Sequence, residues 1–139
     1  MIPIDITPEQ LNKGLKNNLG SHLGIEFLEV SPQLIKAKMP VDHRTVQPFG
    51  ILHGGASVVL AETLGSIAAQ MNIDQENFMA VGLDINANHI RSVRSGFVYG
   101  VTKPIHIGRS THVWEINITN EEDKLICVSR LTISVIAKK

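Results

Sequence analysis

Residues near the middle of the chain have the types and order needed to stabilise negative charge. His53-Gly54-Gly55 opens a long apolar run, and no Ser, Thr, Asp or Asn stands there to cap the first N–H groups of a helix. Uncapped N–H groups at the positive end of a helix favour a developing oxyanion, and Gln47 and His53 could add side-chain donors. The alternative is that the glycine pair only permits tight packing, as glycine pairs often do in turns.

Glu62 is the second residue with chemical potential. It is the only charged residue between Ala56 and Met71. A carboxylate among apolar side chains is costly to bury unless it is paired or has a chemical role. Ser66 lies one helical turn further on, on the same face. A half-exposed carboxylate, or one paired with Lys or Arg, is the other interpretation, and the residues alone leave both open.

The spacing of these two groups indicates that they act in different chains. Eight residues separate Gly54 from Glu62, which is about 12 Å along a helix. An oxyanion donor and an attacking carboxylate must both lie roughly 3 Å from the reacting carbonyl. Two antiparallel copies side by side satisfy this, so we predict a composite site at a homodimer interface, with Glu62 from one chain and His53-Gly54-Gly55 from the other.

A buried helix must position these residues. From Ala56 to Met71 the apolar residues lie all round the expected helix, so it must be enclosed, and the run is too short to span a bilayer. Six segments have the one-sided apolar pattern of strands: 25–30, 34–39, 81–87, 97–106, 111–119 and 124–136. The predicted class is α+β, with an antiparallel six-stranded sheet wrapped around the long central helix in a single domain, residues 1–139. The helix face that the sheet leaves uncovered also predicts a homodimer.

Local patterns give three further predictions. Thr7 to Gln10 has the residues of a helix start, and leucines at four-residue steps predict one helix that ends at Gly20. A turn is expected over residues 31–33. In the strand over 81–87, alternate residues should share the buried face: Val81, Leu83, Ile85 and Ala87.

Composition excludes several classes of protein. Thirteen basic and thirteen acidic side chains cancel, which gives no support to nucleic acid or an anionic membrane as a general partner. Cys127 is the only cysteine, so no internal disulfide exists, and we expect it in the core. There is no short-spaced Cys or His pair for zinc and no Gly-x-Ser-x-Gly elbow. The amino terminus lacks a signal-peptide pattern, so a cytoplasmic location is expected.

The segments 41–66 and 81–96 together resemble the hotdog-fold acyl-CoA thioesterases. The motif is His-Gly-Gly with a glutamate eight residues after the first glycine. The most similar branch contains hydroxybenzoyl-CoA thioesterases, the proofreading thioesterase of enterobactin synthesis and the dihydroxynaphthoyl-CoA thioesterase of menaquinone biosynthesis. The resemblance covers nearly the whole chain, is weakest over residues 1–20, and does not fix the substrate.

The resemblance implies a dimer-of-dimers tetramer without metal or redox cofactor, in which coenzyme A is part of the substrate. It implies that Glu62 is the catalytic carboxylate, acting as nucleophile or as base on water that Ser66 holds. Gln47 and His53 would lie near the thioester carbonyl, which an N–H group of Gly54-Gly55 polarises. The implied coenzyme-A-binding residues are Gly82, His89, Ile90, Arg91 and Ser92, and the turn His106, Ile107, Gly108, Arg109, Ser110 and Thr111.

The expected reaction is hydrolysis of an acyl-CoA thioester to the free acid and coenzyme A. By resemblance, an aromatic acyl group such as dihydroxynaphthoyl or hydroxybenzoyl is the first expectation, and a medium-chain acyl group is the second. Arginines in predicted loops, among them Arg91 and Arg109, suit the phosphates of coenzyme A. Two other functions stay open: a hotdog enoyl-thioester hydratase or dehydratase, and a non-catalytic acyl-CoA binding module.

Overall fold

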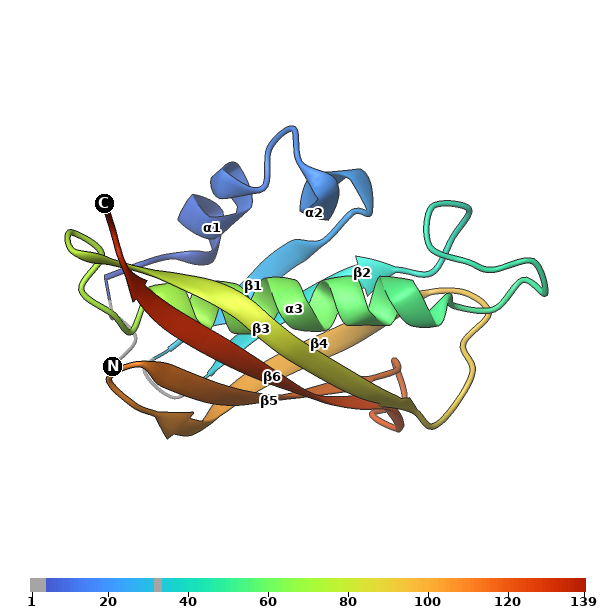
Figure 1. Ribbon diagram of the computed structural model, residues 1–139. Helices are drawn as coiled ribbons and strands as arrows, with labels where there is room; N and C mark the ends of the chain where they lie inside the picture. Colours follow the sequence, from blue (N-terminus) through green and yellow to red (C-terminus); the bar gives the residue numbers. More distant parts are fainter. Residues whose placement is uncertain (1–4, 32–33) are drawn as a thin grey trace.

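The computed structural model describes residues 5–31 and 34–139. Its elements are α1 (Pro8–Gly14), α2 (Leu19–His22), β1 (Glu26–Val30), β2 (Ile35–Pro40), α3 (Gly54–Gln70), β3 (Phe78–His89), β4 (Phe97–Ile107), β5 (Thr111–Thr119) and β6 (Leu125–Ala137). The strands pair antiparallel in the order β1-β2-β4-β5-β6-β3, and the sheet curls around α3 (Figure 1). The predicted α+β hotdog architecture is confirmed, and all six strands lie where the apolar patterns placed them.

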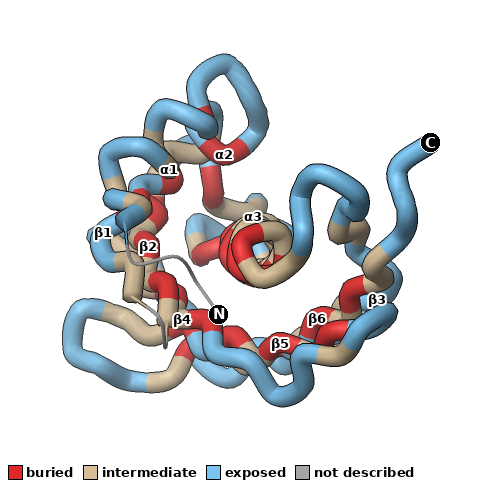
Figure 2. The backbone as a smooth tube through the Cα atoms, turned by 90° about the vertical axis from the view of Figure 1, so that its left-hand side faces the viewer, coloured by how far each residue is buried: buried red, intermediate tan, exposed pale blue. Residues whose placement is uncertain are grey.

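Helix α3 is buried on one side and half-buried on the other. Its fully buried residues face the inner surface of the curled sheet, where the sheet's own buried residues lie (Figure 2): Leu60, Ala61, Leu64, Ala68 and Ala69. A second stripe at intervals of three and four residues is only half-buried: Val59, Glu62, Thr63, Ser66 and Ile67. The sheet of one chain therefore leaves one side of this apolar helix uncovered, as the pattern predicts.

The amino-terminal region differs from the prediction of one helix ending at Gly20. The capping box at Thr7 is confirmed, since the Gln10 N–H donates to Thr7 Oγ1 at 3.3 Å and the Thr7 N–H donates to Gln10 Oε1 at 2.8 Å. However, the helix ends at Gly14, Asn17 adopts a left-handed φ of 62°, and Asn18 caps a second short helix. Asparagine favours both positions, and this local preference overrides the leucine spacing. Two of the residues of the turn expected over 31–33 lie outside the described ranges.

Strand β3 contains a bulge that changes which residues face the helix. The pairing with β6 shifts between Gly82 and Asp84, so Leu83 is unpaired and 70% exposed. Gly82 lies opposite buried Ile133, and Ile85 lies opposite buried Leu131. The predicted inward face is therefore correct for Ile85 and Ala87 but wrong for Val81 and Leu83, because the extra residue reverses the alternation.

The close packing of the sheet on α3 predicts that Gly100→Ala destabilises the fold. A Cβ at Gly100 would lie 2.6 Å from Leu64 Cδ1 and 3.3 Å from the Leu60 side chain, and both leucines are fully buried. Overpacking of this kind typically costs about 1–3 kcal/mol in the free energy of unfolding. Urea denaturation measures it. In Gly14→Ala, the matched control, the new Cβ has no neighbour within 4 Å, and we expect no loss. Equal stability of both variants would contradict the packing described here.

Among the described helices, none is long and apolar enough to cross a membrane.

Candidate active site

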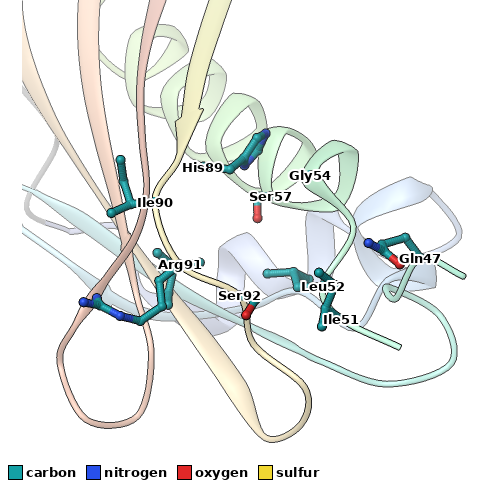
Figure 3. Close-up of a pocket in the computed structure, with 10 residues that line it drawn as sticks. Gln47, Ile51, Leu52, Gly54, Ser57, His89, Ile90, Arg91 and Ser92 are labelled. Atoms are coloured by element: carbon teal, nitrogen blue, oxygen red, sulfur yellow. The ribbon is translucent and has the colours of Figure 1, made fainter. Parts of the chain in front are cut away.

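A cavity of about 330 Å³ opens at the amino-terminal end of α3 (Figure 3). Three segments meet there: the loop that leads into α3 with the first turn of the helix, the end of β3 with the loop after it, and the start of β6. Its lining residues are Gln47, Ile51, Leu52, Gly54, Ser57, His89, Ile90, Arg91, Ser92 and Ile126. The fold thus brings together the predicted residues before the helix and the predicted run 89–92, which are far apart in the sequence.

The start of α3 is capped by His53 itself. The Gly55 N–H donates to His53 Nδ1 at 2.7 Å, and the His53 N–H donates to the Thr45 carbonyl at 2.8 Å. The prediction of an uncapped helix start is therefore wrong for Gly55, because an imidazole nitrogen replaces the usual hydroxyl or carboxylate acceptor. The Gly54 N–H, one residue earlier, has no acceptor within the described ranges. The Gly54 N–H is the donor that remains for a ligand, and Nδ1 of His53 is occupied as an acceptor.

The cap predicts that His53→Ala lowers stability by about 1 kcal/mol, the usual cost of losing an N-cap acceptor. His53→Asn keeps an acceptor that helix starts favour, so it should recover most of that loss. The free energies of unfolding in urea measure both effects. Equal losses in the two variants would show that the imidazole contributes by something other than capping.

Gln47 is held in one orientation by its own loop. Its side-chain Oε1 accepts from the Phe49 N–H, and its backbone N–H donates to the Ile51 carbonyl at 2.9 Å. Gly50, with φ of 78°, closes this turn. Because Oε1 is occupied as an acceptor, Nε2 is the end of the amide that can donate to a ligand. The side chain lies beside the segment leading into α3 at the edge of the cavity (Figure 3).

His89 packs against the backbone of the first helical residue. A Cβ on Gly54 would lie 2.8 Å from His89 Nε2 and 3.1 Å from Cε1, so only glycine allows this approach without displacing the ring. His89 ends β3, and its ring lies next to the start of α3 in Figure 3. The imidazole therefore borders the same space as the Gly54 N–H.

Glu62 lies farther along α3, half-buried and next to β3. A Cβ on Gly82 would lie 3.3 Å from Glu62 Oε1, so the glycine leaves room beside the carboxylate. Within the described part of the chain, Glu62 takes part in no ion pair and accepts no side-chain hydrogen bond. The alternative of a pairing with Lys or Arg is therefore wrong for these residues. Glu62 does not line the cavity at Gly54, as the estimate of about 12 Å along the helix requires.

The two predicted coenzyme-A segments lie at opposite ends of the sheet in one chain. His89 pairs with Cys127 and Thr111 pairs with Ser134. These positions on β6 are seven residues apart, about 23 Å at 3.3 Å per residue. Arg91 is exposed at the cavity, where its Nη1 donates to the Leu125 carbonyl at 2.9 Å. The turn His106–Thr111, which includes exposed Arg109, is remote from the cavity. One chain therefore does not bring all the predicted coenzyme-A-binding residues together.

Ser57 lies at the site although residue type and spacing do not predict it. It lines the cavity although its exposure is only 1%. The signal available was its position three residues after Gly54, on the same side of the helix. It was overlooked because a small hydroxyl in an apolar helix is an ordinary core residue.

The remaining titratable groups of the interior do not add a second site. Burial, with a smaller effect of His106, lowers the pKa of His112, which lies at the far end of the sheet. Burial raises the pKa of the Cys127 thiol, so this cysteine is a core residue as predicted and not a thiolate nucleophile. Residues 5–31 and 34–139 contain no group of three His, Cys, Asp or Glu side chains placed to hold a metal ion.

Comparisons with known proteins agree with this fold. Residues 49–127, more than half of the chain, match the family model described as the thioesterase superfamily. The chain is 50% identical over 131 residues to 1,4-dihydroxy-2-naphthoyl-CoA hydrolase of Escherichia coli, covering 94% of this chain and 96% of that protein. It is 47% identical over 130 residues to the proofreading thioesterase EntH of Cronobacter turicensis, covering 94% of each.

Solved structures give the same result. A mutant of thioesterase PA1618 from Pseudomonas aeruginosa superimposes with a TM-score of 0.96 at 47% identity, covering 99% of each chain. The chain therefore belongs to the thioesterase superfamily. It is an enzyme with the hotdog fold, a thioester hydrolase.

Proposed function

We propose that the protein hydrolyses an acyl-CoA thioester at a site shared by two chains. The observation that carries this proposal is the pair of unsatisfied groups on α3: the Gly54 N–H at its start and the unpaired Glu62 carboxylate about two turns on. Each has the chemistry that thioester hydrolysis needs, and one helix holds them too far apart to act on one carbonyl. A twofold partner with antiparallel α3 supplies the missing half of each site.

Strand β3 is the edge at which the second copy would pair. It has twelve residues, lies at the end of the sheet beside the half-buried stripe of α3, and exposes apolar side chains such as Leu83 and Met79. A long unpaired edge next to apolar surface favours association with another strand. Antiparallel pairing of two β3 strands would extend the sheet across both chains and place the two α3 helices side by side. We expect pairs of such dimers to form the tetramer, in the cytoplasm.

In the proposed mechanism, the thioester carbonyl oxygen accepts from the Gly54 N–H and from Gln47 Nε2. Glu62 of the partner subunit either attacks the carbonyl carbon or takes a proton from water that Ser66 holds. The tetrahedral intermediate then collapses, the carbon–sulfur bond breaks, and coenzyme A leaves as the thiolate. With water as nucleophile this gives the free acid directly, whereas attack by Glu62 gives a mixed anhydride that water then hydrolyses to the free acid and the Glu62 carboxylate. Label in the Glu62 carboxylate after a single turnover in ¹⁸O-water would demonstrate the covalent route, because general-base catalysis places the oxygen of water only in the product acid.

An aromatic acyl group is the proposed substrate class, with medium-chain acyl groups second. The relative named 1,4-dihydroxy-2-naphthoyl-CoA hydrolase supports this choice. Further support for the catalytic pair comes from SAV0944 of Staphylococcus aureus, 40% identical, whose solved mutants replace a glutamine and a glutamate fifteen positions apart. Gln47 and Glu62 have the same separation.

Heterodimers with separately tagged chains test the shared site. A Glu62→Ala chain paired with a Gly54→Pro chain contains one intact site, so about half of the wild-type release of coenzyme A is expected. A wild-type chain paired with the double variant contains no intact site and should be inactive. A site within one chain gives the reverse result, so this pair of measurements decides between the two arrangements.

A further inference from the structure

Ser57 is a buried residue whose hydroxyl borders the cavity and has no hydrogen-bond partner among the described residues. Its exposure is 1%, and its side chain makes no hydrogen bond to any described residue, whereas its backbone N–H donates to the His53 carbonyl. Figure 3 shows the hydroxyl pointing away from α3 into the space that Leu52 and the run 89–92 border. A hydroxyl that borders a cavity and has no protein partner is free to hydrogen-bond to a bound ligand.

The cavity changes in character from its floor to its mouth. The floor consists of buried Leu52, Ile126 and Ser57, whereas the mouth consists of exposed residues such as Ile90 and Arg91. The cationic, solvated mouth suits the polar pantetheine and phosphates of coenzyme A. The floor offers apolar walls and one hydroxyl, which suits a largely apolar group that carries a single hydrogen-bonding substituent.

We propose that Ser57 determines specificity by hydrogen-bonding to a hydroxyl or carbonyl substituent on the acyl group of the substrate. This inference rests on the proposed thioesterase function. Ser57 follows Gly54 by three residues, about 4.5 Å along the helix axis and nearly one full turn. A carbonyl oxygen at the Gly54 N–H therefore places the body of the acyl group beside the Ser57 hydroxyl.

Ser57→Ala tests the proposal with benzoyl-CoA and its 2-, 3- and 4-hydroxy derivatives. We expect kcat/KM for the preferred hydroxybenzoyl-CoA to fall about tenfold while that for benzoyl-CoA changes by less than about twofold. Ser57→Cys nearly preserves the side-chain volume but hydrogen-bonds weakly, so it should show the same loss of selectivity. Equal falls for all four substrates, or an unchanged ratio, would overturn the assignment.

Ser129→Ala is the matched control. Its hydroxyl is buried without a hydrogen-bond partner, and it lies on β6, where it does not line this cavity. The selectivity ratio of this variant should equal that of the wild type. The urea midpoint of Ser57→Ala should equal or exceed the wild-type value, because the mutation removes an unpaired polar group. A lower midpoint would indicate a structural hydrogen bond and would count against the proposal.

The wild-type measurement separates this inference from the function on which it rests. One result is that the wild type releases coenzyme A from these substrates while Ser57→Ala leaves the ratio of kcat/KM between hydroxybenzoyl-CoA and benzoyl-CoA unchanged. That result supports the thioesterase function and rejects the role of Ser57. Failure of the wild type to release coenzyme A from all four substrates rejects the role of Ser57 together with the aromatic substrate class on which it rests.

Discussion

Replacing Glu62 by alanine is expected to reduce the release of coenzyme A from an aromatic acyl-CoA by about a thousandfold, at nearly unchanged KM. The loss of a nucleophile or general base removes transition-state stabilisation and leaves substrate binding largely intact. Glu62→Gln should be as defective, because the amide has similar size but neither attacks nor accepts a proton. Reaction of the released thiol with a chromogenic disulfide measures the rate.

The fold should tolerate this substitution. Glu62 has no ion pair within the described ranges and alanine favours helices, so we expect the free energy of unfolding to stay equal or rise. Glu29→Ala, which removes an exposed carboxylate from β1, is the activity control and should resemble the wild type. Rates within about threefold of wild type for Glu62→Ala would exclude the carboxylate from the chemical step.

Gly54→Pro is expected to lower kcat by about a hundredfold or more relative to Gly54→Ala, because it removes one oxyanion donor. Proline is well tolerated at the first position of a helix, and His53, with φ of −68° and ψ of 130°, has the extended conformation that a residue before proline prefers. The Gly54 N–H has no acceptor in the described chain, so its removal breaks no internal hydrogen bond.

Gly54→Ala is the necessary reference for this effect. Both substitutions add a Cβ that meets the His89 ring at about 2.8 Å, so the displacement of His89 is common to them. Only proline deletes the N–H group. Equal kcat values for the two variants would show that the Gly54 N–H does not bind the oxyanion, whatever the activity of each relative to wild type.

The sequence pattern identified the elements whose burial is regular. The apolar surface of α3, the alternation in β2 and the capping box at Thr7 each depend on local periodicity or local hydrogen bonds, and all three are confirmed. The absence of Glu62 from the cavity at Gly54 also agrees with the spacing argument, because eight helical residues span about 12 Å.

The features that the sequence pattern does not predict each depend on one or two residues whose local preferences outweigh that pattern. Two asparagines end α1 early although the leucine spacing continues, and the extra Leu83 reverses the face of β3. The imidazole of His53 acts as a cap, which the usual preference for Ser, Thr, Asp or Asn does not anticipate. Ser57 matters only through the orientation of its hydroxyl, which residue type and spacing do not specify.

The bulge at Leu83 also determines which side chain lies next to the Glu62 carboxylate on α3. Without the bulge, Leu83 and not Gly82 would face α3 at this position. The leucine side chain would then occupy the space beside Glu62 that Gly82 leaves open. The one extra residue in edge strand β3 thus leaves the Glu62 carboxylate accessible from the side of β3. A relative in which β3 is regular would need a different small residue at that place to keep its carboxylate reachable.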